Sequence, residues 1–231
     1  MLDQAFDALK TYDWGVDPNV LKPIDEAIVA THSDAAARKE LEARLIAVLK
    51  TEMPRAAKDA VCRALKTIGT AASVPALAAL LADEKLSHMA RYALERIPEP
   101  EAGQAMREAL PKVSAKLRIG LLASLGVRGE ATAIAPLQAL LADSDPSVAA
   151  AAAYGLGAIR SLEAAKALVV TKPNAGTKAA IADASMACAE TLLAAGNKVA
   201  AKATYEKILA STPSKAAKAA ATRGLQACAS K

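Results

Sequence analysis

One pattern restricts this fold more than any other: a leucine, two spacer residues and an Ile or Leu recur together along the chain. The repeated positions are Leu65 with Ile68, Leu94 with Ile97, Leu122 with Leu125, and Leu156 with Ile159. Successive leucines of this column lie 29, 28 and 34 residues apart. A recurrence of roughly 20 to 50 residues indicates a repeat array, in which each unit packs only on its neighbours.

The composition favours helices as the repeated elements. Hydrophobic residues make up 53% of the chain, but aromatic residues only 3%. Alanine is the best helix former, whereas the aromatic residues that favour strands are scarce. We therefore expect an all-α fold, an α-α superhelix of stacked antiparallel helix pairs. Thirteen or fourteen helices are expected, near residues 2–12, 18–31, 34–50, 55–68, 73–82, 87–97, 101–110, 114–125, 131–142, 146–159, 162–169, 178–195, 198–210 and 213–229.

Polar residues before prolines and isolated glycines mark where these helices begin and end. Three polar residues that precede a proline are expected to be helix N-caps: Asp17, Asp145 and Thr212. Three glycines that follow apolar runs are expected to end helices in the left-handed conformation: Gly69, Gly126 and Gly196. The helices are therefore short, as in a helical repeat protein.

The apolar spacing within one repeat explains why helix pairs must stack. The helix near residues 87–97 places five apolar side chains on one face: Met89, Ala90, Ala93, Leu94 and Ile97. Tyr92 points away from that face. The preceding helix offers a second apolar row that includes Val74 and Leu77. One pair cannot bury both of its apolar faces alone, so we expect neighbouring pairs to cover them.

The central residues resemble a known family. The motif Leu77-x-x-Leu80-Leu81-Ala82-Asp83 returns as Leu137-x-x-Leu140-Leu141-Ala142-Asp143, and Asp145-Pro146-Ser147-Val148 follows it. Together with the Ala/Gly-Leu-x-x-Ile helix ends, these motifs resemble HEAT repeats of the short, bacterial, phycobilisome-lyase-like type over roughly residues 53–170. The resemblance implies a stack of helix pairs, a fold that chiefly serves as a protein-binding scaffold.

A second resemblance covers one helix pair near the C-terminus. The motif Leu192-Leu193-Ala194-Ala195-Gly196-Asn197, with Ala203-x-Tyr205-x-x-Ile208-Leu209, is similar to a tetratricopeptide hairpin. A change of composition at residues 171–176 separates it from the HEAT-like part. We therefore expect one continuous solenoid with an N-terminal helical cap (1–52), HEAT-like repeats (53–171) and a C-terminal, tetratricopeptide-like cap (172–231).

The charge of the chain is concentrated at its C-terminal end. The formal net charge is +5. After Asn197 there are six lysines and one arginine against Glu206 alone, so that segment carries +6. The cysteines Cys62, Cys188 and Cys228 are odd in number and far apart, which argues against a disulfide framework.

No membrane segment or leader is expected from the sequence. The longest uncharged stretch, residues 67–82, is interrupted by Gly69 and Pro75 and is shorter than the roughly 20 apolar residues of a membrane-spanning helix. The first residues lack the basic lead and apolar core of a signal peptide. We therefore expect a soluble protein without membrane insertion, cytoplasmic from the sequence as given, or exported to the periplasm if a leader has been removed.

We expect no catalytic, cofactor-binding or metal site. The two histidines, His32 and His88, have no Asp, Glu or Cys at i+3 or i+4 to complete a ligand pair. HEAT-like di-iron hydroxylases, by contrast, carry several adjacent His-Glu pairs. No Gly-x-Ser-x-Gly nucleophile motif occurs. Gly155-Leu156-Gly157 lies in an alanine-rich segment without a preceding strand, so close helix packing explains it better than a dinucleotide-binding turn.

The candidate binding residues are exposed positions on the second helix of each pair. They stand at equivalent distances from the leucine column and are expected to line up along the concave side of a solenoid. The candidates are Arg63, His88, Tyr92, Arg96, Lys116 and Tyr154. Tyr and Arg are enriched among residues that dominate binding energy. The favoured hypothesis is a non-enzymatic scaffold that binds a protein partner along this face.

Two other functions stay open. The C-terminal lysines could neutralise phosphates, which would make the chain a nucleic-acid-binding repeat protein. The family resemblance also suggests a lyase-like enzyme acting on a bound chromophore, for which the residues themselves offer no catalytic group.

Overall fold

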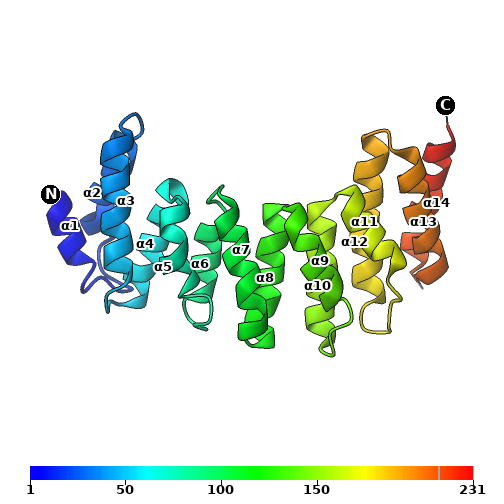
Figure 1. Ribbon diagram of the computed structural model, residues 1–231, viewed down its shortest axis with the longest axis horizontal. Coiled ribbons are helices and arrows are strands. Elements are labelled where there is room, and N and C mark those ends of the chain that lie inside the picture. Colours follow the sequence, from blue (N-terminus) through cyan, green and yellow to red (C-terminus); the bar gives the residue numbers. More distant parts are fainter. Residues whose placement is uncertain (213, 231) are drawn as a thin grey trace. The chain divides into compact units, whose positions relative to one another are not determined.

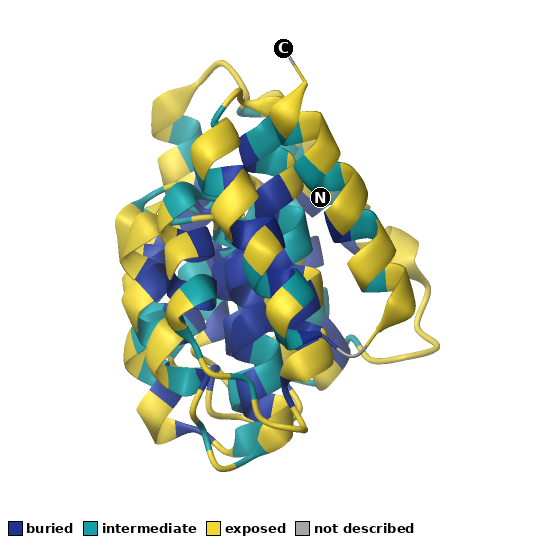
Figure 2. Cartoon of the chain, turned by 90° about the vertical axis from the view of Figure 1, so that its right-hand side faces the viewer, coloured by how far each residue is buried: buried dark blue, intermediate teal, exposed yellow. Residues whose placement is uncertain are grey.

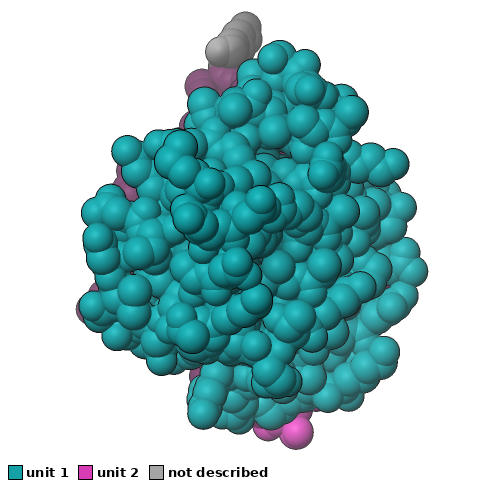
Figure 3. Space-filling model, turned by 90° about the vertical axis from the view of Figure 1, so that its left-hand side faces the viewer, with its two compact units in different colours: residues 1–117 teal, residues 118–231 magenta. Residues whose placement is uncertain are grey.

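The computed structural model describes residues 1–212 and 214–230. The chain divides into two compact units, Met1–Leu117 and Arg118–Lys231, coloured separately in Figure 3. Every regular element of the described residues is a helix, so the all-α prediction is confirmed. Within each unit the helices follow one another in chain order (Figure 1).

Unit 1 is a stack of helices in which each packs on its near neighbours. Its elements are α1 (Leu2–Ala8), the 3-10 helix η1 (Pro18–Leu21), α2 (Lys22–Ala30), α3 (Ala35–Leu49), α4 (Arg55–Ile68), η2 (Ala71–Ser73), α5 (Val74–Ala78), α6 (Ser87–Leu94), α7 (Pro100–Ala109) and η3 (Leu110–Lys112). Helix α4 contacts α3 and α6, and α5 contacts α6 and α7. Contact with the next helix and the next but one is typical of a helical repeat stack.

Unit 2 repeats the same arrangement. Helix α8 (Ala115–Arg128) begins before the division between the units, and the elements that follow it are η4 (Ala131–Ala133), α9 (Ile134–Leu140), α10 (Pro146–Ile159), α11 (Leu162–Val170), α12 (Lys178–Ala194), α13 (Lys198–Ser211) and α14 (Lys215–Ala229). Helix α10 contacts α9, α11 and α12, and α13 contacts α11, α12 and α14. The predicted stacking of helix pairs is therefore confirmed within each unit.

The leucine column lies in the core. Leu65, Leu94, Leu122 and Leu156 are all 0% exposed. In α6 the predicted apolar face is buried as well, whereas Tyr92 on the opposite side is 42% exposed. Figure 2 shows the buried positions gathered between the helices and the exposed ones on the outer turns. Each fully buried leucine contributes about 1.5–3 kcal/mol, which explains why this column recurs in every repeat.

Two of the three predicted N-caps are confirmed. The side chain of Asp17 accepts a hydrogen bond from the backbone N–H of Asn19, and that of Asp145 accepts from Ser147. The prediction for Thr212 is wrong, because Ser214 caps α14 instead. The Ser214 hydroxyl accepts from the N–H of Ala217 at 3.2 Å. Pro213, the expected first residue of this helix, lies outside the described residues.

Of the three expected helix-ending glycines, only Gly196 fits the prediction in full. Gly196 has a φ of +78° and the predicted left-handed conformation. Gly69 follows the end of α4 but is extended, with φ −64° and ψ 144°, so its left-handed prediction is wrong. Gly126 does not end a helix, because α8 continues to Arg128 and Gly129 takes the left-handed conformation at φ +70°.

Gly126 is required for packing instead. A Cβ atom at Gly126 would lie 2.9 Å from Cα of Gly155 on α10. A Cβ atom at Gly157, on the same helix, would lie 2.7 Å from Cα of Ala184 on α12. Real side chains do not approach so closely, and the helices are at these distances only because glycine has no Cβ. The interpretation of Gly155-Leu156-Gly157 as a close-packing element is therefore confirmed.

A buried carboxylate links α3 to the corner that follows α4. Glu42 is only 4% exposed, and its Oε1 accepts hydrogen bonds from the N–H of Thr70 at 2.7 Å and from the hydroxyl of Ser73 at 2.6 Å. Burying a carboxylate is costly unless such donors compensate it. Glu42 therefore fixes the turn that leads into η2 and α5.

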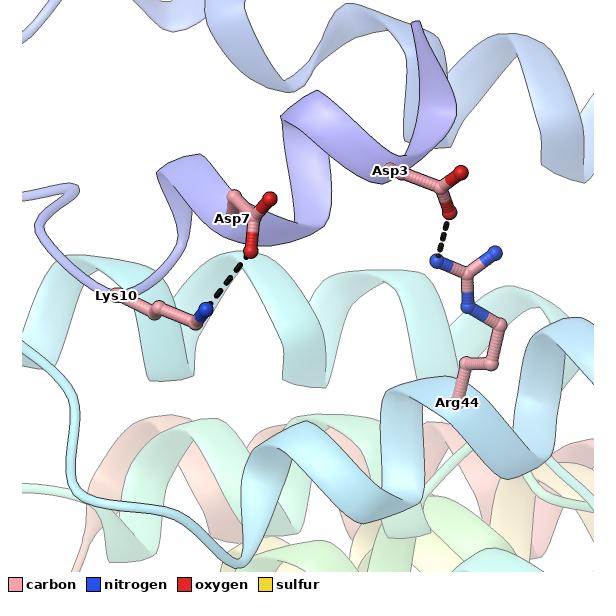
Figure 4. A network of polar contacts seen from close by, with 4 residues as sticks. All are labelled: Asp3, Asp7, Lys10 and Arg44. Atoms are coloured by element: carbon pink, nitrogen blue, oxygen red, sulfur yellow. Dashed lines mark hydrogen bonds and ion pairs between the residues drawn. The ribbon is translucent and has the colours of Figure 1, made fainter.

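Contacts of Arg44 with Asp3 and Phe6 hold helix α1 on α3, and Figure 4 shows the polar ones. Arg44 pairs with Asp3 at 2.6 Å, and its guanidinium carbon lies 4.2 Å from the ring centroid of Phe6. Asp7 accepts from Lys10 at 2.8 Å, and this hydrogen bond lowers the pKa of the Asp7 carboxyl. Exposed ion pairs stabilise little, so burial of Phe6, which is 7% exposed, contributes more to the attachment of α1.

Candidate functional site

The candidate site is a groove in unit 1 of about 740 Å³, formed by α2, α4, α6 and the loop after α1. We call it the unit 1 groove. Three of the predicted binding residues, Arg63, His88 and Tyr92, line it. Trp14 and Val29 contribute its apolar wall on the N-terminal side. Its volume lies within the roughly 300 to 1,000 Å³ of typical ligand sites.

Helical spacing explains how α4 supplies this groove. Arg55, Asp59 and Arg63 follow one another at intervals of four residues, so they stand on one side of α4. Leu65 and Val61 point to the core and are at most 1% exposed. On the neighbouring α6, His88 and Tyr92 repeat the interval of four. Two parallel rows of polar side chains therefore face the same groove.

The charges on α4 are only partly compensated within the protein. Arg63 pairs with Asp59 at 2.6 Å, and this hydrogen bond raises the pKa of the Arg63 guanidinium above its usual value. Arg63 is nevertheless 66% exposed. No carboxylate among the described residues forms an ion pair with Arg55, which is also exposed. The groove therefore presents cationic groups that can receive a carboxylate from outside.

A second contact orients the tyrosine of the groove. Lys66 Nζ donates a hydrogen bond to Tyr92 Oη at 2.5 Å and lies 4.0 Å from the centroid of the Tyr92 ring. The hydrogen bond and the charge of Lys66 lower the pKa of the Tyr92 phenol, and the charges of Arg63 and Arg96 act in the same direction. The Tyr92 ring is thus held in place while it stays accessible.

The apolar wall of the groove is unusually exposed. Trp14 is 67% exposed and Val29 is 74% exposed. Trp14 lies in the loop between α1 and η1, where its backbone N–H donates to the side chain of Asp13 at 2.9 Å. Large exposed side chains beside polar groups are typical of protein-binding surfaces.

The other predicted residues lie outside this groove. Arg96 is exposed just beyond the end of α6. Lys116, at the start of α8, pairs with Glu84 at 3.2 Å. Tyr154 stands on α10 in unit 2, where it is 53% exposed. The structure thus brings together half of the predicted set, and the binding role of all six residues stays a prediction.

Four lining residues of the groove were not predicted from the sequence, two that precede the repeats and two on α4. Trp14, Val29, Arg55 and Lys66 were not expected to contribute. Trp14 is the only tryptophan of the chain and stands in a polar segment, between Asp13 and Gly15. A tryptophan placed outside any apolar periodic run indicates an exposed aromatic residue, and this signal could have identified it.

Four of the C-terminal lysines, Lys198, Lys202, Lys215 and Lys218, are exposed on α13 and α14. Lys202 is 3.9 Å from Glu206, and Lys198 donates to the backbone oxygen of Ser230 at 2.6 Å. Tyr205, the only aromatic residue of this segment, is 2% exposed and packs against Gly224. It is therefore not available for stacking with bases. The nucleic-acid hypothesis rests on charge alone.

The residues that the structure describes contain neither a cluster of metal-ligating side chains nor a candidate membrane span. Within that part of the chain, no group of three or more His, Cys, Asp and Glu side chains is placed to hold a metal ion. None of the helices that the structure describes combines the length and apolar character needed to cross a membrane.

Comparison with known proteins supports the class indicated by the fold. Residues 104–186 match the sequence pattern of HEAT repeats, and the stacked helix pairs of both units have a HEAT-like arrangement. The resemblance noted from the leucine motifs is therefore confirmed at the level of HEAT-like repeats, while the tetratricopeptide-like character of the α12–α13 pair stays a prediction.

More distant similarity extends over the whole chain. Human deoxyhypusine hydroxylase, solved in complex with glycerol, is similar at 15% identity and a TM-score of 0.40, over 98% of this chain and 95% of that chain. No curated protein sequence matches this one. The expectation that this chain is not an enzyme stays a prediction.

Proposed function

We propose that the chain is a protein-binding scaffold and that the unit 1 groove receives a segment of its partner. The observation that carries this proposal is the meeting of Trp14, Tyr92 and Arg63 in one groove of about 740 Å³. Trp, Tyr and Arg are the residue types that most often dominate binding energy at protein interfaces. Each of the three is well exposed, with Tyr92 the least exposed at 42%.

The charges of the groove indicate what such a segment would look like. Arg55 and Lys66 stand among the lining residues, together with the Asp59–Arg63 pair and Asp25, so cations outnumber carboxylates by three to two. A partner residue with a carboxylate would meet these cations, while an apolar residue next to it would pack on Trp14 and Val29. The Lys66–Tyr92 contact reduces the rearrangement that binding needs, because it already holds the ring.

Site-specific cross-linking tests this function. A photoreactive amino acid replaces Thr67, an exposed residue of the groove lining, and the matched control replaces Val127, which is 64% exposed on α8. In cells, we expect a discrete protein adduct from position 67 and none from position 127. Trp14→Ala combined with Tyr92→Ala removes most of the apolar and aromatic contact, so the adduct should fall at least about tenfold.

Three results would contradict the proposal. These are the same adducts at both positions, an adduct that the double substitution leaves unchanged, and adducts that disappear on nuclease treatment. The last result would favour the nucleic-acid hypothesis. Tyr154→Ala, examined in parallel, reports whether the face of α10 contributes to the same partner.

The single tryptophan offers an independent measurement. Trp14 is the only fluorophore of its kind in the chain and is 67% exposed. Titration with the partner segment should therefore shift its emission to shorter wavelength as the indole leaves water. An unchanged spectrum at saturation would place the segment elsewhere.

A further inference from the structure

A second groove lies in unit 2, between α11 and α13, and it has a different chemistry. We call it the α11/α13 groove. It has a volume of about 350 Å³. Apolar side chains form most of its lining, among them Leu162, Val169, Val170, Val199 and Ala203. It shares no residue with the unit 1 groove.

The apolar side chains of this groove are exposed on both of its helices. Val199 on α13 is 84% exposed, and Val170 at the end of α11 is 69% exposed. Val199 is the most exposed valine of the described residues. Helices α11 and α13 contact each other directly, so the two valines border one surface. Apolar side chains that flank a concave surface are typical of a docking site.

Charge indicates the chemistry of the occupant. Lys166 is the one charged residue of the lining, and no carboxylate within the described part of the chain forms an ion pair with it. Lys207 stands one helical turn beyond Ala203 on the same side of α13. The segment after Asn197 carries a net charge of +6. An occupant with carboxylates beside its apolar residues complements this surface.

We propose that the α11/α13 groove binds an acidic amphipathic helix of a partner protein. The apolar face of this helix fills the groove, and its flanking carboxylates meet Lys166 and Lys207. Two neighbouring helices leave a groove into which the side-chain ridge of a third helix packs. A second copy of the chain carries the same net charge of +5, so repulsion disfavours it relative to an acidic partner. The inference does not depend on the unit 1 groove.

The test uses a synthetic helical peptide as the probe and the full chain as the receptor. The peptide carries leucines at i, i+3, i+4 and i+7 and glutamates at the flanking positions, and a fluorescent label reports binding by anisotropy. A second peptide has the same residues in scrambled order, and a third has lysines in place of the glutamates. We expect saturable binding of the first peptide only, weakened at high salt because the lysine contacts are exposed.

Substitutions locate the binding surface. Val199→Glu introduces a charge at the edge of the groove and should weaken peptide binding at least about tenfold, whereas Val127→Glu, at an exposed valine on α8 of unit 2, should leave it unchanged. Residue 199 lies in the first turn of α13, where a carboxylate is favourable, so the fold should persist. Lys166→Glu should weaken the glutamate peptide about fivefold and allow the lysine peptide to bind.

Several results would overturn the proposal. One is equal binding of the ordered and scrambled peptides. Another is an affinity that Val199→Glu and Lys166→Glu leave unchanged. A third is the absence of saturable binding up to about 1 mM peptide, the weak limit of specific recognition. A fourth is self-association of the chain that Val199→Glu abolishes, which would show that a second copy fills the groove.

Discussion

The contact between α10 and α12 predicts that Gly157→Ala destabilises the protein, although alanine is the better helix former. A Cβ atom at position 157 would lie 2.7 Å from Cα and 2.8 Å from Cβ of Ala184. Ordinary carbon contacts are about 3.5 to 4.0 Å. Ala184 has no side-chain torsion that could move these atoms away, so α10 and α12 must separate by about 1 Å.

Two opposing terms set the size of the effect. Replacing a glycine inside a helix by alanine stabilises it by about 1 kcal/mol. Forcing an extra methyl group into a close-packed core costs about 1 to 3 kcal/mol, and contact with a backbone atom places this substitution at the upper end. We therefore expect a net loss of about 2 kcal/mol, or about thirtyfold in the folding equilibrium constant.

Urea unfolding followed by far-ultraviolet circular dichroism measures this difference. The matched control is Ala158→Gly at the next residue of α10, which is exposed. The Ala158→Gly substitution changes helix propensity alone and should lower the free energy of unfolding by about 1 kcal/mol. If Gly157→Ala instead stabilised the protein by about 1 kcal/mol, propensity would be the whole effect and the close-packing argument would be refuted.

Two further predictions concern titratable groups. Burial raises the pKa of Cys62 to about 12 and that of Cys188 to about 11. Iodoacetamide at about pH 8 should therefore modify the half-buried Cys228 first, which mass spectrometry would show. Equal labelling of the three cysteines would contradict the burial of Cys62 and Cys188. Lys66→Met should raise the pKa of Tyr92, because it removes both the hydrogen bond and the nearest cation. A titration of the tyrosine carbon signals by nuclear magnetic resonance, with Tyr92→Phe to assign the signal, should detect this rise. An unchanged pKa of Tyr92 would argue that the Lys66–Tyr92 contact is absent in solution.

The features of the fold that could be predicted from the sequence depend on local periodicity. The buried leucine column and the face of α6 follow from apolar spacing within single helices, and both were predicted correctly. At Gly126 the prediction failed because a distant helix decides the outcome, whereas at Thr212 it failed for a local reason. Gly126 stays inside α8 because α10 approaches it there, and no local signal reports that approach. Ser214, which directly precedes α14, caps that helix in place of Thr212.

Local periodicity also decides which residues of the candidate site could be predicted from the sequence. Arg63, His88 and Tyr92 could be found from the sequence because they recur at fixed distances from the leucine column, and repeats place such positions on a common face. Trp14 and Val29 belong to elements that precede the repeats and share no register with them. Their place beside α4 and α6 depends on how the N-terminal helices pack, which periodicity within a repeat does not encode.

The buried carboxylate of Glu42 has a consequence for how the chain can be shortened. A fragment that begins at residue 53 keeps the leucine column but loses the acceptor of the Thr70 N–H and the Ser73 hydroxyl. Ser73 is 0% exposed, so water could reach its hydroxyl only if the corner before α5 opened. Shortened forms that include α3 should therefore express as folded protein, whereas those that start after it should be prone to proteolysis at this corner.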